Sequence, residues 1–452
     1  MAKERKNSYT LLLTIATASF LMTFMASSVT IALPSIGKDF KCDAVLLGWI
    51  VTVYLLSVAS FLVPLGRIAD IKGKRKIFLT GLFVYTLASG LAAASPSATL
   101  LVFSRVIQGT GAAMIFSTAV AILTSAFPST EIGKIFGINT AAVYAGLSFG
   151  PVFGGFLTQN FGWRSIFLLN VPIGAFIALL VGLKLKEEWI EAKEEKFDLV
   201  GSIIYGLALV FIVYGASTLE LIFALFGLLC LTFFIYWESK VNDPILETKL
   251  FKENITFSFS NAATFLNYSS TFAVGFLLSL YLQYIKNLTP QDTGIILMVQ
   301  PVIQSILSPI AGWLSDKIEP RTVASAGMCT IAFSLLNFSK VNENSPLSII
   351  ILNLMLLGIG FALFSSPNTN AVMSSVKRKF YGVASAILAT MRLTGQMVSM
   401  VLVMIVFSVY IGNAKIAEAK THFIVSMGVL FILLSMICFI GTCFSIARGK
   451  IR

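Results

Sequence analysis

Charged residues are scarce in this chain, and acidic residues are the scarcest. Only 12% of its 452 residues are charged, with 33 Lys and Arg against 21 Asp and Glu, whereas 57% are apolar. A soluble chain of this length would form about three domains, each with its own polar surface. So few charges exclude that organisation, and the sequence therefore predicts a polytopic membrane protein.

Residues that carry metal, redox or acid–base chemistry are also few. The chain has one histidine, His422, and five cysteines that are scattered mainly through apolar runs, which argues against a disulfide framework and a metal site. No Gly-x-x-x-x-Gly-Lys-[Ser/Thr] motif occurs, which argues against ATP-driven pumping. We find no His, Cys and carboxylate cluster and no soluble signalling domain. The chain is therefore expected to be neither an enzyme nor a receptor, and to need no cofactor.

What the chain has instead is a series of apolar runs, each roughly the 20 residues that a helix needs to cross a bilayer. Six runs come first, two follow a polar segment at 184–198, and six complete the chain. The sequence predicts an all-α protein of fourteen transmembrane helices: a six-helix bundle at 1–184, a linker with two additional helices at 185–240, and a second six-helix bundle at 241–452. We also expect a short helix within the linker at 184–198. The fourteen expected spans are 9–33, 45–65, 77–94, 99–126, 132–157, 165–183, 199–217, 219–237, 255–285, 294–314, 323–338, 347–373, 381–411 and 423–447.

The basic residues indicate the orientation of these helices. An even number of spans puts both termini on one side, where the tails and loops contain 24 Lys and Arg; the opposite loops contain seven. The positive-inside rule then makes both termini cytoplasmic. The net charge of +12 thus reflects topology and not nucleic-acid binding, and we expect a multi-pass protein of the plasma membrane.

The most polar stretch between two apolar runs is residues 66–76, Gly-Arg-Ile-Ala-Asp-Ile-Lys-Gly-Lys-Arg-Lys, which we call the first turn. A weaker copy, Gly-Trp-Leu-Ser-Asp-Lys-Ile-Glu-Pro-Arg at 312–321, is the second turn. Both begin Gly-x-x-x-Asp after an apolar run. Two related halves are typical of secondary transporters, whose substrate site lies between them.

The first turn matches Gly-x-x-x-Asp-x-x-Gly-[Arg/Lys]-[Arg/Lys]-[Arg/Lys] and so resembles the signature between helices 2 and 3 of the major facilitator superfamily. Two further stretches resemble motifs of its fourteen-helix drug:proton antiporters: Arg-x-x-Gln-Gly-x-Gly from Arg105, and Gly-x-x-x-Gly-Pro-x-x-Gly-Gly from Gly146. The resemblance covers nearly the whole chain. It implies a major facilitator fold and a multidrug efflux antiporter that confers drug resistance, with protons as the coupling ion.

The two turns supply the candidate residues of a cytoplasmic gate. Glycines permit a sharp turn, and an aspartate can accept hydrogen bonds from free N–H groups at a helix N-terminus. We expect the aspartate of the first turn to face the start of the helix at 381–385, and that of the second turn to face 131–134. The alternative is that these charges only solvate a loop. The candidates are Gly66, Asp70, Gly73, Arg75 and Asp316.

Arg105 lies within an expected span, where an arginine is costly unless it faces a cavity or a partner. Gln108 follows three residues later and shares its helix face. The resemblance implies that Arg105 takes part in proton coupling. The alternative is that Arg105 lies close enough to the outer surface to snorkel.

The span at 132–157 carries glycines four residues apart, which form a flat strip for close helix packing, and a proline that kinks the helix. The resemblance associates this motif with exporters, whereas generic packing would explain the glycines alone. Its members are Gly146, Gly150, Pro151, Gly154 and Gly155.

The first span departs from the antiporter pattern Leu-Asp-x-Thr-x-x-Asn-x-Ala-Leu-Pro. Aligned on Ala-Leu-Pro, Met25 replaces the acid and Thr30 replaces the asparagine. No Asp or Glu lies near the middle of any span, so Arg105 and Arg392 have no obvious buried acidic partner. This departure argues against proton coupling through a membrane carboxylate and favours an anionic or zwitterionic substrate.

Polar side chains in the spans of the second half complete the candidates for coupling or substrate binding. Uncompensated amides are unfavourable in lipid, so some of them should face a cavity, although helix packing is the alternative for each. These candidates are Arg392, Gln396, Gln300 and Asn261.

The sequence therefore predicts a secondary active exporter of amphipathic small molecules that works by alternating access in exchange for protons. The alternative is a more selective exporter or facilitator of an anionic or peptide-like metabolite, without carboxylate-based proton coupling. In either case we expect a small-molecule substrate, a monomer in the lipid bilayer, and no metal, cofactor or nucleic acid.

Overall fold

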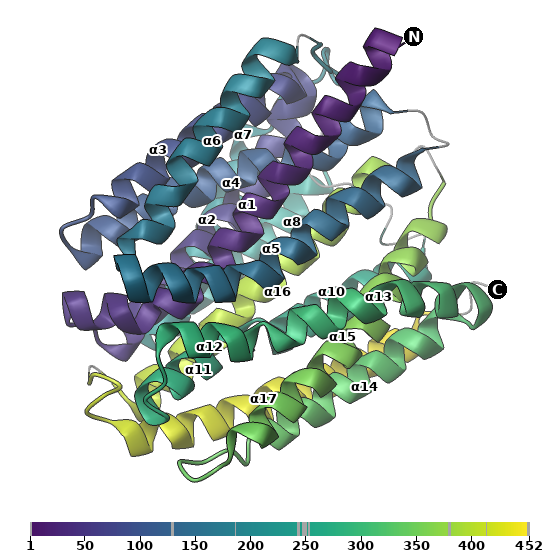
Figure 1. The fold of residues 1–452 in the computed structure, drawn as a ribbon. Helices are drawn as coiled ribbons and strands as arrows, with labels where there is room; N and C mark the ends of the chain where they lie inside the picture. The colour runs from purple at the N-terminus through teal and green to yellow at the C-terminus, as the bar shows by residue number, and fades with distance from the viewer. Residues whose placement is uncertain are drawn as a thin grey trace. The chain divides into compact units, whose positions relative to one another are not determined.

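The computed structural model of the chain describes residues 2–127, 131–185, 187–241, 245, 251, 254–377, 381–412 and 414–449, and of residues 2–8, 132 and 133 it describes the backbone alone. Within these ranges every regular element is a helix (Figure 1). The prediction of an all-α protein is confirmed.

Eight helices form the first part of the chain, and their bounds follow the apolar runs. Six of them come before the polar segment at 185–198, and two come after it. They are α1 (Ala2–Phe40), α2 (Ala44–Lys72), α3 (Lys74–Ala93), α4 (Ala98–Ala126), α5 (Ile132–Phe161), α6 (Arg164–Lys184), α7 (Leu199–Thr218) and α8 (Leu221–Glu238).

The remaining spans include two that are built from more than one element. The expected span 255–285 consists of α10, α11 and a π-helical segment η1, and the expected span 294–314 falls on α12 and α13, which meet at Met298. The elements are α10 (Ile255–Thr271), α11 (Ala273–Leu280), η1 (Tyr281–Ile285), α12 (Pro290–Leu297), α13 (Val299–Lys317), α14 (Pro320–Phe338), α15 (Leu347–Ser374), α16 (Tyr381–Tyr410) and α17 (Lys420–Ala447).

In the described part of the chain, thirteen helical stretches are long and apolar enough to cross a membrane. The fourteenth expected span is α14, which has 19 residues and packs against α15 and α17, both of which are among the thirteen. The fourteen-helix architecture of six, two and six is therefore present in this protein.

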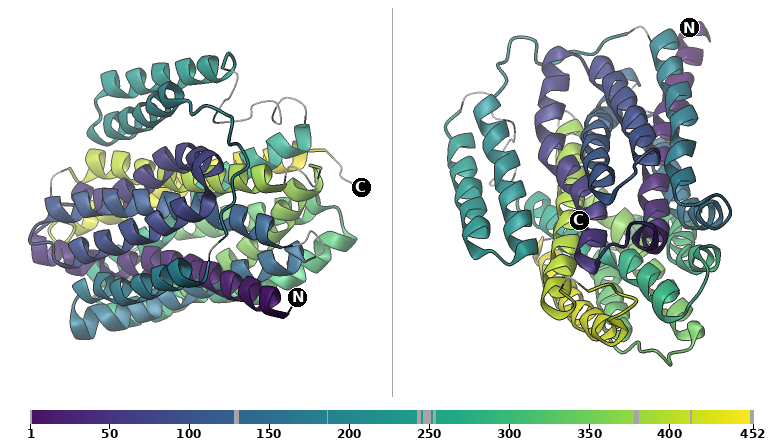
Figure 2. Two further views of the ribbon diagram at one scale, coloured as in Figure 1. Left: turned by 90° about the horizontal axis from the view of Figure 1, so that it is seen from above. Right: turned by 90° about the vertical axis from the view of Figure 1, so that its left-hand side faces the viewer.

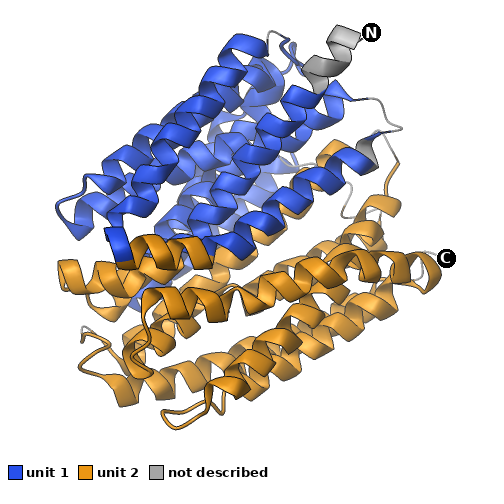
Figure 3. Ribbon diagram, viewed as in Figure 1, with its two compact units in different colours: residues 1–29, 49–150, 160–247 blue, residues 30–48, 151–159, 248–452 orange. Residues whose placement is uncertain are grey.

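Contacts divide the chain into two compact units (Figure 3). Unit 1 comprises Met1–Val29, Trp49–Gly150 and Asn160–Glu247, and unit 2 comprises Thr30–Gly48, Pro151–Gln159 and Thr248–Arg452. The predicted domains 1–184, 185–240 and 241–452 divide the chain by the order of its helices and not by contacts. They stay a prediction.

The two additional helices pair with each other. In unit 1, α7 packs against α8 as an antiparallel hairpin, seen side by side in both views of Figure 2. Aromatic rings join the two helices, with Tyr205 and Phe234 at a centroid distance of 5.2 Å. Leu219, in the left-handed conformation with φ of 60°, makes the short turn between them.

The same close helix packing occurs once in each half. In unit 1 a Cβ atom on Gly111 of α4 would lie 3.0 Å from the carbonyl oxygen of Gly81 in α3. In unit 2 a Cβ atom on Gly360 of α15 would lie 2.9 Å from the carbonyl oxygen of Gly327 in α14. Each pair is reciprocal: a Cβ on Gly81 would lie 2.9 Å from the carbonyl oxygen of Gly111, and one on Gly327 would lie 2.7 Å from that of Gly360. This repeated contact supports the internal duplication that the two turns predicted.

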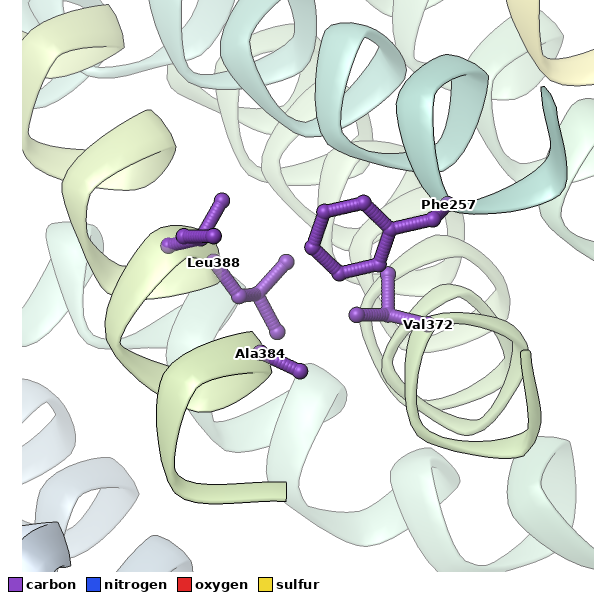
Figure 4. Close-up of a cluster of buried hydrophobic side chains, with 5 residues drawn as sticks. Phe257, Val372, Ala384 and Leu388 are labelled. Carbon is purple, nitrogen blue, oxygen red and sulfur yellow. The ribbon is translucent and has the colours of Figure 1, made fainter. Parts of the chain in front are cut away.

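Unit 2 contains a cluster of buried apolar side chains where α10, α15 and α16 meet. Phe257 of α10 packs with Val372 of α15 and with Ala384 and Leu388 of α16 (Figure 4). These residues lie near the start of α10, the end of α15 and the start of α16. The cluster therefore holds these three helix ends together.

Candidate functional site

The first turn joins α2 to α3 through a single residue, Gly73. Its φ of 114° is one that L side chains rarely adopt, so glycine is required here. A Cβ atom would also lie 2.5 Å from Cδ of Glu188, which belongs to the linker. Gly73, a predicted gate residue, is thus fixed by its backbone conformation and by the close approach of linker residues 187–196, which we call the strap.

The strap supplies carboxylates to the cations of the first turn. Lys74 is only 2% exposed, and its Nζ lies 3.5 Å from Oδ1 of Asp70 and 2.5 Å from Oε1 of Glu191. Arg67 pairs with Glu195 of the strap. Because a buried ammonium needs opposite charge close by, the strap and Asp70 together stabilise Lys74 in its position.

Backbone hydrogen bonds fix the strap along the turn. The N–H of Lys74 donates to the carbonyl of Trp189 at 3.0 Å, and the N–H groups of Glu191 and Ala192 both donate to the carbonyl of Asp70 at 3.1 Å. The strap has no helical residues, so the prediction of a short helix at 184–198 is wrong for the described residues. The physical reason is that the turn takes the peptide groups that a helix would pair internally.

The strap also completes the N-terminus of α3. A helix N-terminus carries partial positive charge, so a start of Lys74, Arg75 and Lys76 is unfavourable by itself. Oε1 of Glu188 accepts a hydrogen bond of 2.8 Å from the N–H of Arg75. Glu188 therefore acts as a cap from outside the helix, where Gly73 has no side chain to offer.

The second turn has different contacts. Asp316 lies in the last turn of α13, where its Oδ1 and the hydroxyl of Ser315 accept hydrogen bonds of 3.3 and 3.2 Å from Nδ2 of Asn370 in α15. Nζ of Lys317 lies 4.0 Å from the ring centroid of Trp313. The first glycines of the two turns are equivalent: a Cβ on Gly66 would contact Ser117 of α4 at 3.4 Å, and one on Gly312 would contact Ser366 of α15 at 3.0 Å.

The predicted gate pairings stay predictions. Asp70 belongs to unit 1 and residues 381–385 to unit 2, whereas Asp316 belongs to unit 2 and residues 131–134 to unit 1. The side chains of residues 132 and 133 lie outside the described residues.

Arg105 of α4 is held by neutral groups inside unit 1. It is 2% exposed; its Nε donates to the carbonyl of Ile50 at 3.2 Å and its Nη1 to Oε1 of Gln108 at 2.6 Å. Nε2 of Gln108 donates in turn to the hydroxyl of Ser89 at 2.8 Å, and the guanidinium lies 4.2 Å from the ring centroid of Tyr54. The predicted pair thus shares one face and joins α4 to α2 and α3.

Met25, at the position of the expected acid, is 1% exposed in α1. Its sulfur accepts a contact of 2.8 Å from Nδ2 of Asn170 in α6. Thr30 belongs to unit 2, where its carbonyl accepts a hydrogen bond of 2.8 Å from the hydroxyl of Ser279. The two candidates on α1 therefore have separate surroundings.

The glycine motif of α5 sits where other helices approach most closely. In unit 1 a Cβ on Gly150 would lie 2.8 Å from the carbonyl of Phe24 in α1, and one on Gly146 would lie 2.6 Å from that of Phe20. In unit 2 a Cβ on Gly155 would lie 2.9 Å from the carbonyl carbon of Pro290 in α12. The motif is thus a packing strip along α5, with Pro151 inside the helix and Gly154 buried beside it.

Among the residues that the structure describes, the candidates in the second half do not form one hydrogen-bonded group. Gln300 donates to Gln304 at 2.9 Å on α13, and the buried Asn261 of α10 donates to the carbonyl of Phe257 at 2.9 Å. Arg392 and Gln396 lie one turn apart on α16, both half-buried. The guanidinium of Arg392 lies 5.2 Å from the ring centroid of Tyr268 in α10.

Sequence reasoning missed the residues that surround these candidates. The strap glutamates could have been found, because the segment 187–196 is rich in glutamate, the first turn is basic, and both loops are expected on the same side of the membrane. Tyr54 and Tyr268 carry no such signal, since each meets its arginine only through the packing of two helices.

Fourteen membrane-type helices, a helix contact repeated in both halves and arginines within the membrane spans define the class of secondary transporters. The chain belongs to the Major Facilitator Superfamily, whose sequence profile matches residues 15–237 and 260–446.

Curated relatives are transport and resistance proteins. The chain is 31% identical to "Riboflavin transporter RibZ" of Clostridioides difficile (strain 630), over 96% of each chain. It is 30% identical to "Multidrug resistance protein Stp" of Mycobacterium tuberculosis (strain ATCC 25618 / H37Rv), over 83% of this chain and 71% of that protein. It is also 30% identical to "Cephamycin export protein CmcT" of Amycolatopsis lactamdurans, over 85% and 82%.

Solved structures share the fold. A bacterial homologue of the human lysosomal transporter Spinster matches 98% of this chain and 96% of its own, with a TM-score of 0.71 at 14% identity. The peptide transporter POT in complex with sulfate matches over the same shares, also with a TM-score of 0.71 at 14% identity. The family, the curated relatives and the apolar helices together show that the chain is a multi-pass membrane transporter of small molecules.

Proposed function

We propose that this transporter is a secondary active exporter of amphipathic small molecules, of the multidrug efflux type, which works by alternating access in exchange for protons. The names of two relatives, a multidrug resistance protein and a cephamycin export protein, support export. The internal duplication supports alternating access, because two similar halves can exchange roles around a site between them.

The observation that carries this proposal is the contact between α1 and α5. Gly150 lies so close to α1 that a Cβ would be 2.8 Å from the carbonyl of Phe24, and the hydroxyl of Ser28 donates to the carbonyl of Gly150 at 2.8 Å. Small residues let the two backbones pack this closely, and Gly150 belongs to the motif whose resemblance is to exporters. This contact supports a role for α5 in export.

The first and second turns are the proposed cytoplasmic gate, with Asp70 and Asp316 as its acceptors. This assignment goes with cytoplasmic termini and a plasma-membrane location, which the 24 basic residues on one side support. Arg105 and Gln108 are the proposed coupling group, and we propose that the transporter works as a monomer.

A second candidate function is a selective exporter or facilitator of an anionic or peptide-like metabolite, without carboxylate-based proton coupling. It is favoured by the surroundings of Met25, whose contact with Asn170 is a neutral one. It is also favoured by Arg105 and Arg392, whose contacts in the described part of the chain are neutral groups and tyrosine rings. Neither arginine has a carboxylate among these contacts, so an acid group of the substrate would supply the opposite charge.

The two candidates are separated by efflux from proteoliposomes with and without an imposed pH gradient, with the lumenal pH recorded. The panel holds a cationic dye, ethidium; a neutral amphipathic compound, riboflavin, chosen from the name of one relative; and an aromatic anion, naphthalene-1-sulfonate. Gradient-driven efflux of the cation or the neutral compound with counter-movement of protons is expected for the multidrug antiporter. Movement of the anion alone, indifferent to the gradient, would establish the selective exporter.

A further inference from the structure

Arg392 differs from the other arginine within a membrane span in what its guanidinium contacts. It lies eleven residues after the start of α16 at Tyr381, which places it roughly 16 Å along the helix. Arg105 is 2% exposed and uses Nε and Nη1 in hydrogen bonds inside unit 1. Arg392 is half-buried, and within the described residues it makes neither a hydrogen bond nor an ion pair.

The contact that Arg392 does make is with an aromatic ring. Its Cζ lies 5.2 Å from the ring centroid of Tyr268 in α10, within the range of a cation–π interaction. The ring centroid of Tyr268 lies 6.3 Å from that of Phe361 in α15, and the two ring planes meet at 58°. Three helices of unit 2 thus bring one guanidinium and two aromatic rings into one place.

Close helix packing fixes this group in position. A Cβ on Gly395 of α16 would lie 2.6 Å from the carbonyl of Phe265 and 3.0 Å from Cβ of Tyr268. The absence of a side chain at Gly395 therefore lets α10 approach α16, and it sets Tyr268 beside Arg392, one turn away. A preorganised site is expected to have this kind of support from the main chain.

The N–H groups of Arg392 make no hydrogen bond to the described residues. Nε is buried and has no hydrogen-bond partner among the described residues. A cation in a membrane span is costly without compensation, and a guanidinium is suited to bind an acid group through two parallel hydrogen bonds. The aromatic rings beside it are suited to a planar apolar group.

We infer that Arg392, Tyr268 and Phe361 form a binding site for the anionic and aromatic part of a small-molecule ligand. The guanidinium pairs with the acid group, and the two rings pack against the planar part. This inference rests on the proposed function, since it names a substrate class for the proposed transport. It selects organic anions that carry an aromatic ring over anions without one.

Direct binding tests the inference without requiring transport. Calorimetric titration of the purified full chain in lipid nanodiscs uses naphthalene-1-sulfonate as the probe, with cyclohexanesulfonate as the anion without an aromatic ring and 1-naphthylmethylammonium as the aromatic cation. We expect Arg392→Gln to weaken naphthalene-1-sulfonate binding at least about tenfold and Tyr268→Leu about threefold. Arg392→Lys keeps the positive charge but cannot form two parallel hydrogen bonds. Its affinity for naphthalene-1-sulfonate should lie between those of the wild type and Arg392→Gln.

Three comparisons make the result decisive. Lys415→Gln removes one positive charge from an exposed ion pair with Glu418 and should leave binding unchanged. The aromatic cation should bind to the wild type more weakly than naphthalene-1-sulfonate does, and an unfolding temperature of Arg392→Gln near that of the wild type shows that this variant is folded. Equal affinity of wild type and Arg392→Gln for naphthalene-1-sulfonate would overturn the inference.

The experiments distinguish a failure of the proposed export from a failure of the proposed binding site. Arg392-dependent binding without efflux of any compound would keep the site and reject the proposed export. Gradient-driven efflux with binding that is indifferent to Arg392 and Tyr268 would keep the export and reject the site.

Discussion

The first and second turns begin with the same Gly-x-x-x-Asp pattern, yet they are stabilised in different ways. In the first turn α3 starts with three cations, and the strap brings Glu188 and Glu191 to that helix end. In the second turn α14 starts with Pro320 after Glu319. A proline at the first helical position has a suitable φ and lacks the N–H that would need a cap.

The two copies of a duplicated turn have thus kept the same Gly-x-x-x-Asp sequence pattern but are stabilised by different contacts. The aspartate of the second turn accepts from an amide of its own half, Asn370 in α15. The aspartate of the first turn faces Lys74, and its backbone carbonyl holds the strap. The first turn therefore depends on the linker between α6 and α7, and the second turn depends on its own helix neighbours.

The largest effect is expected when both carboxylates beside Lys74 are neutralised. Asp70→Asn with Glu191→Gln leaves an ammonium that is 2% exposed without opposite charge, which should lower the free energy of unfolding by about 3 kcal/mol. Lys74→Met removes the buried charge instead and should cost less than about 1 kcal/mol. Thermal unfolding of the purified protein in detergent measures both. Equal losses in the two variants would show that the buried charge is not what the strap compensates.

A single neutralisation in each turn compares their roles in transport. We expect Asp70→Asn to lower the efflux rate about tenfold with near-normal expression, because it weakens both the contact with Lys74 and the proposed gate. Asp316→Asn should lower it less than about threefold, since an amide can keep a hydrogen bond to Asn370. Initial efflux rates from proteoliposomes, normalised to protein content, measure this. Wild-type efflux in Asp70→Asn would remove the gate assignment.

The outermost pair of the strap should matter least. The side chains of Arg67 and Glu195 are 20% and 42% exposed, so Glu195→Gln should cost less than about 1 kcal/mol, and the cost should fall at high salt. Unfolding temperatures at low and high salt test this, with Glu418→Gln in the exposed pair with Lys415 as the matched control. A salt-independent loss in Glu195→Gln alone would place that pair among the structural contacts of the turn.

The sequence was sufficient to predict the membrane architecture, because each helix is encoded by its own apolar run. The reciprocal packing of Gly81 with Gly111 and of Gly327 with Gly360 could not be predicted, because the local sequence of a helix does not determine which other helix it contacts. One expected span breaks at Met298, just before the Gln300-Pro301 dipeptide in the first turn of α13. A proline has no N–H to donate to the preceding turn, so a local cause of the break was visible in the sequence.

The candidate site was predictable in its residue types and less so in its contacts. Arg105 and Gln108 were expected on one face, and they do form a hydrogen bond. The strap was expected to be helical, because its composition favours a helix. The prediction failed because Asp70 and Lys74, more than 110 residues away in sequence, bind its peptide groups. Local propensity gives no access to such a contact.

We propose that the strap and the first turn act as one functional element, and reversing the charges of Lys74 and Glu191 tests this claim most directly. Efflux is measured for Lys74→Glu, for Glu191→Lys and for the double reversal. We expect each single variant to lose efflux about tenfold and the double variant to recover to roughly half of the wild-type rate, because the ion pair is restored in the opposite sense. A double variant no faster than the slower single variant would contradict the claim.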